Sequence, residues 1–326
     1  MNGAGHVRYA YRLRVSSTGP SRLGAECARC RWVWNECVAV SRRLDGLNRP
    51  DGQKAACGPA ELDKMLTQAR QSMALAGGLV LTVVRSRVLP SAPTSVRMYR
   101  DSLGHWYASF VVEAATEPLP STGAVIGIDW GVRETATTTS DEHDLPHAEH
   151  GRTAASKLAR YHRMTARRRT PKYKPDGAGY KRAGRAAAKV SKKIVRQRQD
   201  TARKWAKSIV RDFDHLAVED FRPRFLAQST MARKAADTAI AAAKTALIEM
   251  ARKHGRAVHL VHPAHTTMDC AQCGARAKHR IPLSERTYTC TACGTVSPRD
   301  KNSARVMLVR AGLNPAGADL VSPGVC

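Results

Sequence analysis

Three carboxylates stand in contexts that are unusual for acidic residues. Asp129 ends the apolar run of residues 124–129, and Glu219 ends a second short apolar segment, HLAVE, at residues 215–219. Asp300 stands in the sequence Pro-Arg-Asp-Lys-Asn, at the entry to the last predicted helix. A carboxylate at the end of a buried strand costs free energy unless it is paired or binds a metal ion.

The order strand-Asp, strand-Glu, helix-Asp suits one reaction. Phosphodiester hydrolysis with two metal ions needs acids that converge from separate elements, and Mg²⁺ prefers such oxygen ligands. We therefore expect Asp129, Glu219 and Asp300 to be catalytic residues that bind Mg²⁺. Simpler interpretations stay open: each acid could form a salt bridge, Asp300 could cap the helix, and Asp220 could replace Glu219.

Four cysteines have the spacing of a zinc ribbon. They form two Cys-x-x-Cys pairs about 16 residues apart, Cys270 with Cys273 and Cys290 with Cys293. A glycine follows each pair and relieves the tight turn sterically. Four thiolates fill a tetrahedral site and leave no open position, so the expected zinc ion is structural rather than catalytic.

The net charge points to a polyanionic partner. The chain has 54 Lys and Arg residues against 27 Asp and Glu, a formal charge of +27. Such an excess is typical of nucleic-acid binding, although a basic protein from an Arg-rich lineage or a ribosome-like RNA binder would also show it.

The positive charge is strongest in residues 152–211, which hold 21 Lys and Arg and two acids. A basic segment of this kind binds phosphates without sequence preference, and the alternative is a solvated basic face. The nucleic-acid contacts that we expect come from Arg163, Arg167, Arg168, Arg169, Lys172, Lys181, Arg182, Lys192, Lys193 and Arg196.

The first part of the chain reads as a β structure with an insertion. Residues 7–15 alternate between apolar and basic, residues 79–89 are rich in β-branched side chains, and residues 95–113 form a predicted hairpin. Residues 21–78 read as mostly helical. We expect a small β-barrel or sheet from residues 1–20 and 79–117, interrupted by this helical segment.

A mixed α/β unit is predicted to follow a linker at residues 117–123. Its expected strands are 124–129, 135–139, 215–219 and 258–261, and its expected helices lie within 152–211, over 231–254, and at about 302–311. Gly255 is a suitable end for the second of these helices. The tail from residue 313 is rich in Gly and Pro, and we expect it to be disordered.

The cellular compartment is indicated by the lack of a membrane-spanning apolar run and of a secretory signal. The N-terminus lacks a long apolar run, and the most apolar stretch, Met73 to Val84, is shorter than the ~20 residues that cross a bilayer. Nine cysteines without a secretory signal suggest a reducing compartment. We therefore expect a cytoplasmic, nucleoid-associated protein with no membrane partner.

Several of these motifs resemble the TnpB family of transposon-encoded, RNA-guided nucleases related to type V CRISPR effectors. GIDWGVRETA at residues 127–136 resembles the first RuvC segment, and HLAVEDF at 215–221 the second. The cysteine pairs followed by RDKNSARVML at 299–308 resemble the zinc ribbon and third segment, and RWVWN at 31–35 is similar to a motif of the N-terminal helical region.

The resemblance implies an RNase H-like (RuvC) nuclease domain at residues 124–265 and 295–312, with an inserted zinc ribbon at 266–294. It also implies a preceding β-barrel with a helical recognition insertion. The implied function is Mg²⁺-dependent cleavage of target DNA, directed by a guide RNA from the element's end. Nothing in the sequence indicates an oligomeric state.

Departures from the family pattern keep other functions open. Trp130 stands where the family usually has an aliphatic residue, Pro298 where it often has Asp, and residues 62–89 lack part of the usual recognition helices. The alternatives are a catalytically weak or decayed RNA-guided DNA-binding regulator, and a transposase accessory protein.

Overall fold

The structure is a computed structural model. It describes residues 6–15, 82–84, 88–113, 116–171, 174–221, 237–279, 281–282 and 284–313, together with Ser21, Ala28 and residues 23–25. The chain divides into two compact units, Val7–Val112 and Glu113–Cys326 with the first six residues. Most of the predicted helical insertion, most of residues 62–89 and most of the tail therefore lie outside the described residues.

The smaller unit contains a four-stranded sheet. Its strand order is β2 (Thr82–Val84), β1 (His6–Arg14), β4 (Trp106–Glu113) and β3 (Ser95–Arg100). The β3–β4 hairpin is confirmed, and its turn is closed by the Asp101 carboxylate, which accepts from the backbone N–H groups of Leu103 and His105 at 2.8 and 2.9 Å.

One face of this sheet is apolar, as the alternation in the sequence predicts. Leu13 of β1 and Trp106 and Ala108 of β4 pack with Leu23 in one buried cluster. Within the strand predicted over residues 79–89, β2 covers 82–84, and Val88 and Leu89 lie outside any strand. Residues 79–81 and 85–87 lie outside the described residues. Closure of the sheet into a barrel stays a prediction.

The larger unit contains a mixed five-stranded sheet. Its strand order is β7 (Leu145–Pro146), β6 (Glu134–Thr138), β5 (Val125–Trp130), β8 (His215–Glu219) and β9 (Ala257–Val261). β7, β6 and β5 pair antiparallel, whereas β5, β8 and β9 run parallel. The four strands predicted for this unit are therefore confirmed, and the two-residue β7 was not foreseen.

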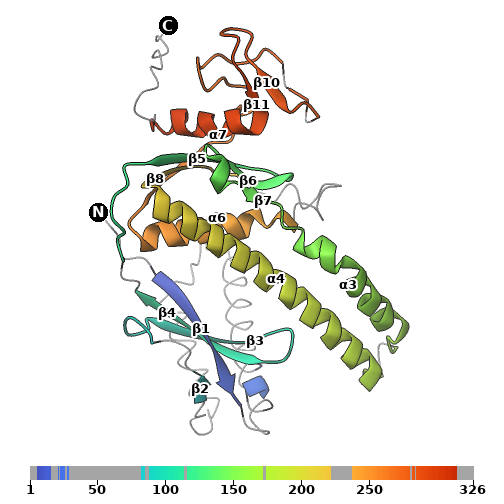
Figure 1. The fold of residues 1–326 in the computed structure, drawn as a ribbon. Coiled ribbons are helices and arrows are strands. Elements are labelled where there is room, and N and C mark those ends of the chain that lie inside the picture. Colours follow the sequence, from blue (N-terminus) through green and yellow to red (C-terminus); the bar gives the residue numbers. More distant parts are fainter. Residues whose placement is uncertain are drawn as a thin grey trace, which may run out of the picture. The chain divides into compact units, whose positions relative to one another are not determined.

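Helices cover both faces of this sheet (Figure 1). α4 (Ala178–Asp212) and α6 (Ile240–Lys253) lie on one face, and α7 (Arg299–Arg310) lies on the other. The side chains of β5 alternate accordingly: Ile126, Ile128 and Trp130 enter the α4/α6 core, and the residues between them face α7. No helix of the described residues is both long and apolar enough to cross a membrane.

α4 is long because only its C-terminal half belongs to the core. Trp205, Ala206 and Ile209 are buried against the sheet. The N-terminal half instead lies antiparallel beside α3 (His150–Arg167), and together they form a hairpin that extends away from the sheet (Figure 1). The basic segment thus forms two helices, since α3 ends at Arg167 and α4 begins at Ala178.

Helix boundaries differ from the sequence prediction at two places. α7 begins at Arg299, three residues before the predicted start, because the backbone of Pro298 is extended and serves as its N-cap. The helix predicted over 231–254 is interrupted at Ala239, which adopts a left-handed backbone with φ 56° before α6 begins at Ile240. The predicted start lies outside the described residues. The predicted end is correct, since Gly255 follows with φ 70°.

Candidate functional site

A close approach between α7 and β5 brings the first and third acids to one place. A Cβ atom added at Gly127 would lie 2.0 Å from the backbone oxygen of Ala304, so only glycine allows the helix to rest directly on the strand. Asp129 lies two residues along β5 on the same face, and Asp300 lies one turn before Ala304. The first turn of α7 is therefore held beside the end of β5.

The second acid reaches the same place because β8 is parallel to β5. Ile128 pairs with Val218, so Glu219 follows beside Asp129 at the ends of adjacent strands. Trp130 connects the two ends: its backbone N–H donates to Glu219 Oε2 at 3.4 Å, and its indole N–H donates to the Glu219 carbonyl at 3.1 Å. The unusual tryptophan thus fixes the end of β8.

Burial and mutual repulsion disfavour the charged forms of these acids. Asp129 is 8% exposed and Glu219 is 7% exposed. Burial, followed by the negative charges of Glu219 and Asp300, raises the pKa of Asp129 well above its ordinary value. Burial raises the pKa of Glu219 to about 7. A cation placed among the three carboxylates would remove both penalties, and oxygen donors of this kind fit Mg²⁺.

Two simpler interpretations of the acids fit the structure less well. Asp220 turns to Lys244, whose ammonium group donates to it at 2.6 Å, so Glu219 and not Asp220 faces Asp129. Asp300 is not the N-cap of α7, a place that Pro298 takes, and the helix has no side-chain cap. The nearest cation to Asp300 among its ion pairs is Arg286, at 3.8 Å.

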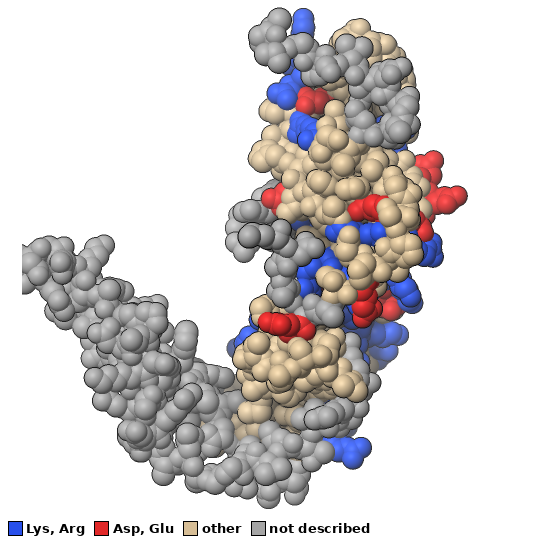
Figure 2. Space-filling model, turned by 90° about the vertical axis from the view of Figure 1, so that its left-hand side faces the viewer, with Lys and Arg blue, Asp and Glu red and all other residues tan. Residues whose placement is uncertain are grey.

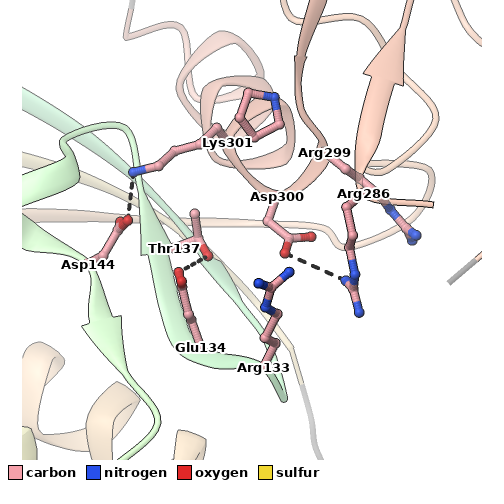
Figure 3. A pocket seen from close by; sticks show the side chains of 9 residues that line it. Arg133, Glu134, Thr137, Asp144, Arg286, Arg299, Asp300 and Lys301 are labelled. Atoms are coloured by element: carbon pink, nitrogen blue, oxygen red, sulfur yellow. Dashed lines mark hydrogen bonds and ion pairs between the residues drawn. The ribbon is translucent and has the colours of Figure 1, made fainter. Parts of the chain in front are cut away.

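A pocket of about 200 Å³ opens beside Asp300. Figure 3 shows the side chains of Arg133 and Arg286 approaching the Asp300 carboxylate, while Lys301 points away from it to Asp144. The lining residues come from the β5–β6 turn, β6, the cysteine-rich region and the start of α7: Arg133, Glu134, Thr137, Asp144, Arg286, Pro298, Arg299, Asp300 and Lys301.

The four predicted cysteines come together. Their sulfur atoms all lie within 4.8 Å of one another, and they are the one such group of ligands among the described residues. Asp129, Glu219 and Asp300 do not form such a group, so their carboxylate oxygens lie farther apart than the cysteine sulfur atoms. The Sγ atoms of Cys270 and Cys293 lie 3.7 Å apart, and those of Cys273 and Cys290 lie 3.6 Å apart. This cluster could hold zinc.

The two cysteine turns have the same backbone geometry. The N–H group of Gly274 donates to the Cys270 carbonyl at 2.9 Å, and Gly294 donates to Cys290 at the same distance. Both glycines have positive φ, 75° and 74°, which explains why glycine follows each pair. β10 (Thr287–Thr289) and β11 (Val296–Pro298) pair beside the turns, and β11 leads directly into α7.

A buried asparagine joins the cysteine cluster to the acid site. Asn302, 2% exposed, accepts from the N–H group of Ala271 at 3.1 Å and donates to the Asp269 carbonyl at 2.8 Å. It stands two residues after Asp300. This role is not evident from the sequence, in which the one signal is an asparagine, a residue of low helix propensity, in the first turn of a helix.

The predicted nucleic-acid contacts lie along the α3/α4 hairpin. Lys172 is outside the described residues, Lys192 is half-buried, and the others are exposed: Arg163, Arg167, Arg168, Arg169, Lys181, Arg182, Lys193 and Arg196. On the face shown in Figure 2, Lys and Arg side chains are interspersed with Asp and Glu. Contacts of this hairpin with nucleic acid stay a prediction.

Known proteins are similar to this chain over the segments that contain the three acids and the four cysteines. A family model described as "Probable transposase" matches residues 109–257, and a model described as "Cas12f1-like, TNB domain" matches residues 242–307. A protein of Streptomyces pristinaespiralis named "Putative RNA-guided DNA endonuclease" is 30% identical over 242 residues, which are 73% of this chain and 58% of the relative.

A second relative carries a different name. The "CRISPR-associated DNA-binding protein Cas12m" of Allomeiothermus silvanus is 32% identical over 133 residues, 38% of this chain and 25% of the relative. The chain thus spans less than two thirds of the length of either relative.

Among solved structures, a cryo-EM structure of the Cas12f1–sgRNA–target DNA complex is similar at 14% identity and a TM-score of 0.41. The match covers 65% of this chain and 55% of that chain. A TM-score at this level supports no assignment by itself. The family models and the sequence relatives show similarity over residues 109–307, the region whose motifs resemble the TnpB family.

Proposed function

We propose that the protein is an RNA-guided endonuclease that cuts target DNA in a RuvC-type site. The observation that carries the proposal is the convergence of Asp129, Glu219 and Asp300 from two parallel strands and a helix start, with raised pKa values at Asp129 and Glu219. The strand order β7-β6-β5-β8-β9, antiparallel then parallel, supports an RNase H-like domain. The names of the relatives support guided endonuclease activity.

In this proposal the three acids hold Mg²⁺. Bound there, the ions would lower the pKa of the attacking water and neutralise charge on the phosphate. Glu219 stands at the end of β8 with a pKa of about 7, so its carboxyl group is partly protonated at neutral pH and gives up that proton to become a ligand. Trp130 holds the same carboxylate in place from its backbone N–H.

We assign the remaining parts by the same reasoning. Cys270, Cys273, Cys290 and Cys293 would hold one structural Zn²⁺, since four sulfur donors leave no open position. The basic α3/α4 hairpin would contact phosphates of the guide RNA or of the DNA paired to it, which is backbone binding without base readout.

The test is a cleavage assay on the complex as cells produce it. The protein is purified from cells that carry the DNA flanking its gene, the bound RNA is sequenced, and matching DNA is added with Mg²⁺. We expect a defined RNA and cleavage, lost in Asp129→Ala with RNA and DNA binding retained. Asp220→Asn is the matched control, because Asp220 pairs with Lys244, and it should still cut. Loss of binding together with cleavage in Asp129→Ala would argue against a catalytic role.

A second candidate function is guided DNA binding without cleavage. The observation in its favour is the 32% identity over 133 residues to a relative that is named a DNA-binding protein. The same assay separates the two functions: a defined RNA and tight target binding with no cleavage in Mg²⁺ would establish the binder.

A further inference from the structure

We propose that the pocket beside Asp300 binds a phosphate of the DNA strand next to the bond that is cut, and that Arg133 is its principal ligand. This inference deepens the proposed nuclease function and rests on it. It adds a substrate-positioning residue, Arg133, to the three acids. Arg133 lies in the turn between β5 and β6.

The position of Arg133 suits this role. It is exposed, it lines the pocket, and it has no hydrogen bond or ion pair within the described part of the chain. Its guanidinium group points toward Asp300 from the side opposite the start of α7 (Figure 3). An arginine that has no protein partner keeps its hydrogen-bond donors available for two oxygen atoms of a phosphate.

The charges of the pocket favour an anion. Lys301 is already neutralised, because its ammonium group contacts Asp144 at 2.7 Å and Asp141 at 2.6 Å. The remaining cations are Arg133, Arg286 and Arg299, and the remaining anions are Glu134 and Asp300. The pocket therefore has an excess of positive charge even before a cation binds at Asp300.

A second, independent feature indicates a ligand at this place. Arg299 is 5% exposed and lines the pocket, yet its buried Nε–H has no hydrogen-bond partner. Its Nη1 group is committed to the backbone carbonyl of Pro282 at 2.9 Å. A buried donor without a partner costs free energy, so a small shift of this side chain toward a phosphate oxygen in the pocket would be favourable.

The pocket also adjoins the acids. Asp300 belongs to both, and the positive charge of Arg299 lowers the pKa of Asp129. A strand whose phosphate lies in the pocket would thus present its neighbouring phosphodiester to the carboxylates. Arg286, 3.8 Å from Asp300, is close enough to join the phosphate once Asp300 holds a cation.

The experiment measures binding of a short fluorescent single-stranded DNA to the protein–RNA complex by anisotropy. Ca²⁺ replaces Mg²⁺ so that the strand is not cut. Arg133→Ala is compared with Arg305→Ala, which removes the same charge from an exposed position of α7 outside the pocket. We expect Arg133→Ala to weaken binding about tenfold to a hundredfold, Arg133→Lys to weaken it less, and Arg305→Ala to change it by less than about twofold.

A substrate change identifies the phosphate. In a series of strands, one phosphate at a time is replaced by an uncharged methylphosphonate. If Arg133 binds the phosphate next to the cleavage position, that replacement should weaken binding to the wild-type protein but hardly affect Arg133→Ala, because the two changes remove the same contact. A structural role for Arg133 would give additive losses at every position.

Equal affinities of Arg133→Ala and Arg305→Ala, or additive losses throughout the series, would overturn the inference. Cleavage by the wild-type complex in Mg²⁺ is scored separately. The nuclease function can therefore stand while the phosphate pocket fails, and binding at the pocket can be observed in a protein that does not cut.

Discussion

Replacing Glu219 by Gln should stabilise the metal-free protein at alkaline pH. The pKa of this carboxyl group is about 7 in the folded chain, against an ordinary value of 4.5. A group whose pKa is raised by folding stabilises the folded state fully only below the unfolded pKa, and that contribution is lost as the pH rises through the folded pKa. Ionised Glu219 therefore lowers the free energy of unfolding above pH 7.

The size of the effect follows from the shift. A difference of about 2.5 units corresponds to about 3 kcal/mol, so at pH 8 the Glu219→Gln variant should exceed the wild type in stability by up to about 3 kcal/mol. The side chain is 7% exposed, and solvent screening reduces this value little. At pH 5 the wild-type carboxyl group is protonated in the folded state, and the gap should shrink below about 1 kcal/mol.

The assay is equilibrium unfolding in urea with a chelator, followed by tryptophan fluorescence. Trp130 contacts Glu219 directly and reports on this part of the fold. Mg²⁺ should stabilise the wild type by mass action and stabilise Glu219→Gln much less. The difference in unfolding free energy between the two proteins should therefore narrow or change sign when the ion is added. The variant should not cut DNA.

A Glu219→Gln variant that is less stable than the wild type at pH 8 in the chelator would refute this prediction. An equal difference in unfolding free energy between variant and wild type at pH 5 and pH 8 would refute it as well. Either result would mean that Glu219 is ionised and satisfied in the metal-free fold, as an acceptor for the Trp130 N–H group, and that its burial is structural.

Two further predictions concern the elements that hold the acids. Gly127→Ala should destabilise the larger unit by about 1–3 kcal/mol and reduce cleavage, because the new methyl group overlaps the α7 backbone. In the same unfolding and cleavage assays Gly184→Ala, which has open space in α4, should leave cleavage unchanged and stabilise the unit by up to about 1 kcal/mol, because alanine has the higher helix propensity. Cys290→Ser should reduce the zinc content measured by metal analysis and destabilise the same unit, since zinc binding is coupled to folding. Full stability without zinc would contradict a structural ribbon.

The sequence predicts those parts of the fold that local patterns specify. The short apolar runs that become β5 and β8, the hairpin around Asp101 and the two Cys-x-x-Cys turns are each visible within a few residues. The acids are visible for the same reason, because a carboxylate at the end of an apolar run is conspicuous. The start of α7 is not, since its first turn is stabilised by tertiary contacts: Arg299 donates to the Pro282 carbonyl and Lys301 to Asp144.

The polar partners around the site are invisible in the sequence for a related reason. Arg133 and Asp300 share a pocket although they come from distant segments. The choice between Glu219 and Asp220 also depends on a distant residue, since Lys244 binds Asp220 and leaves Glu219 to face Asp129. A local sequence pattern cannot predict such contacts, because the packing of the helices on the sheet determines which distant residues meet.

That packing makes one helical turn the junction of the whole site. Successive residues of a helix point in directions about 100° apart. Asp300 therefore faces the other acids, Lys301 reaches Asp144 and the backbone of Thr138, and Asn302 holds the first cysteine turn. Because these three contacts share one rigid turn, a displacement of the cysteine turn moves Asp300 as well. Zinc at the cysteines would then be required for the geometry of the acids, although no cysteine touches them.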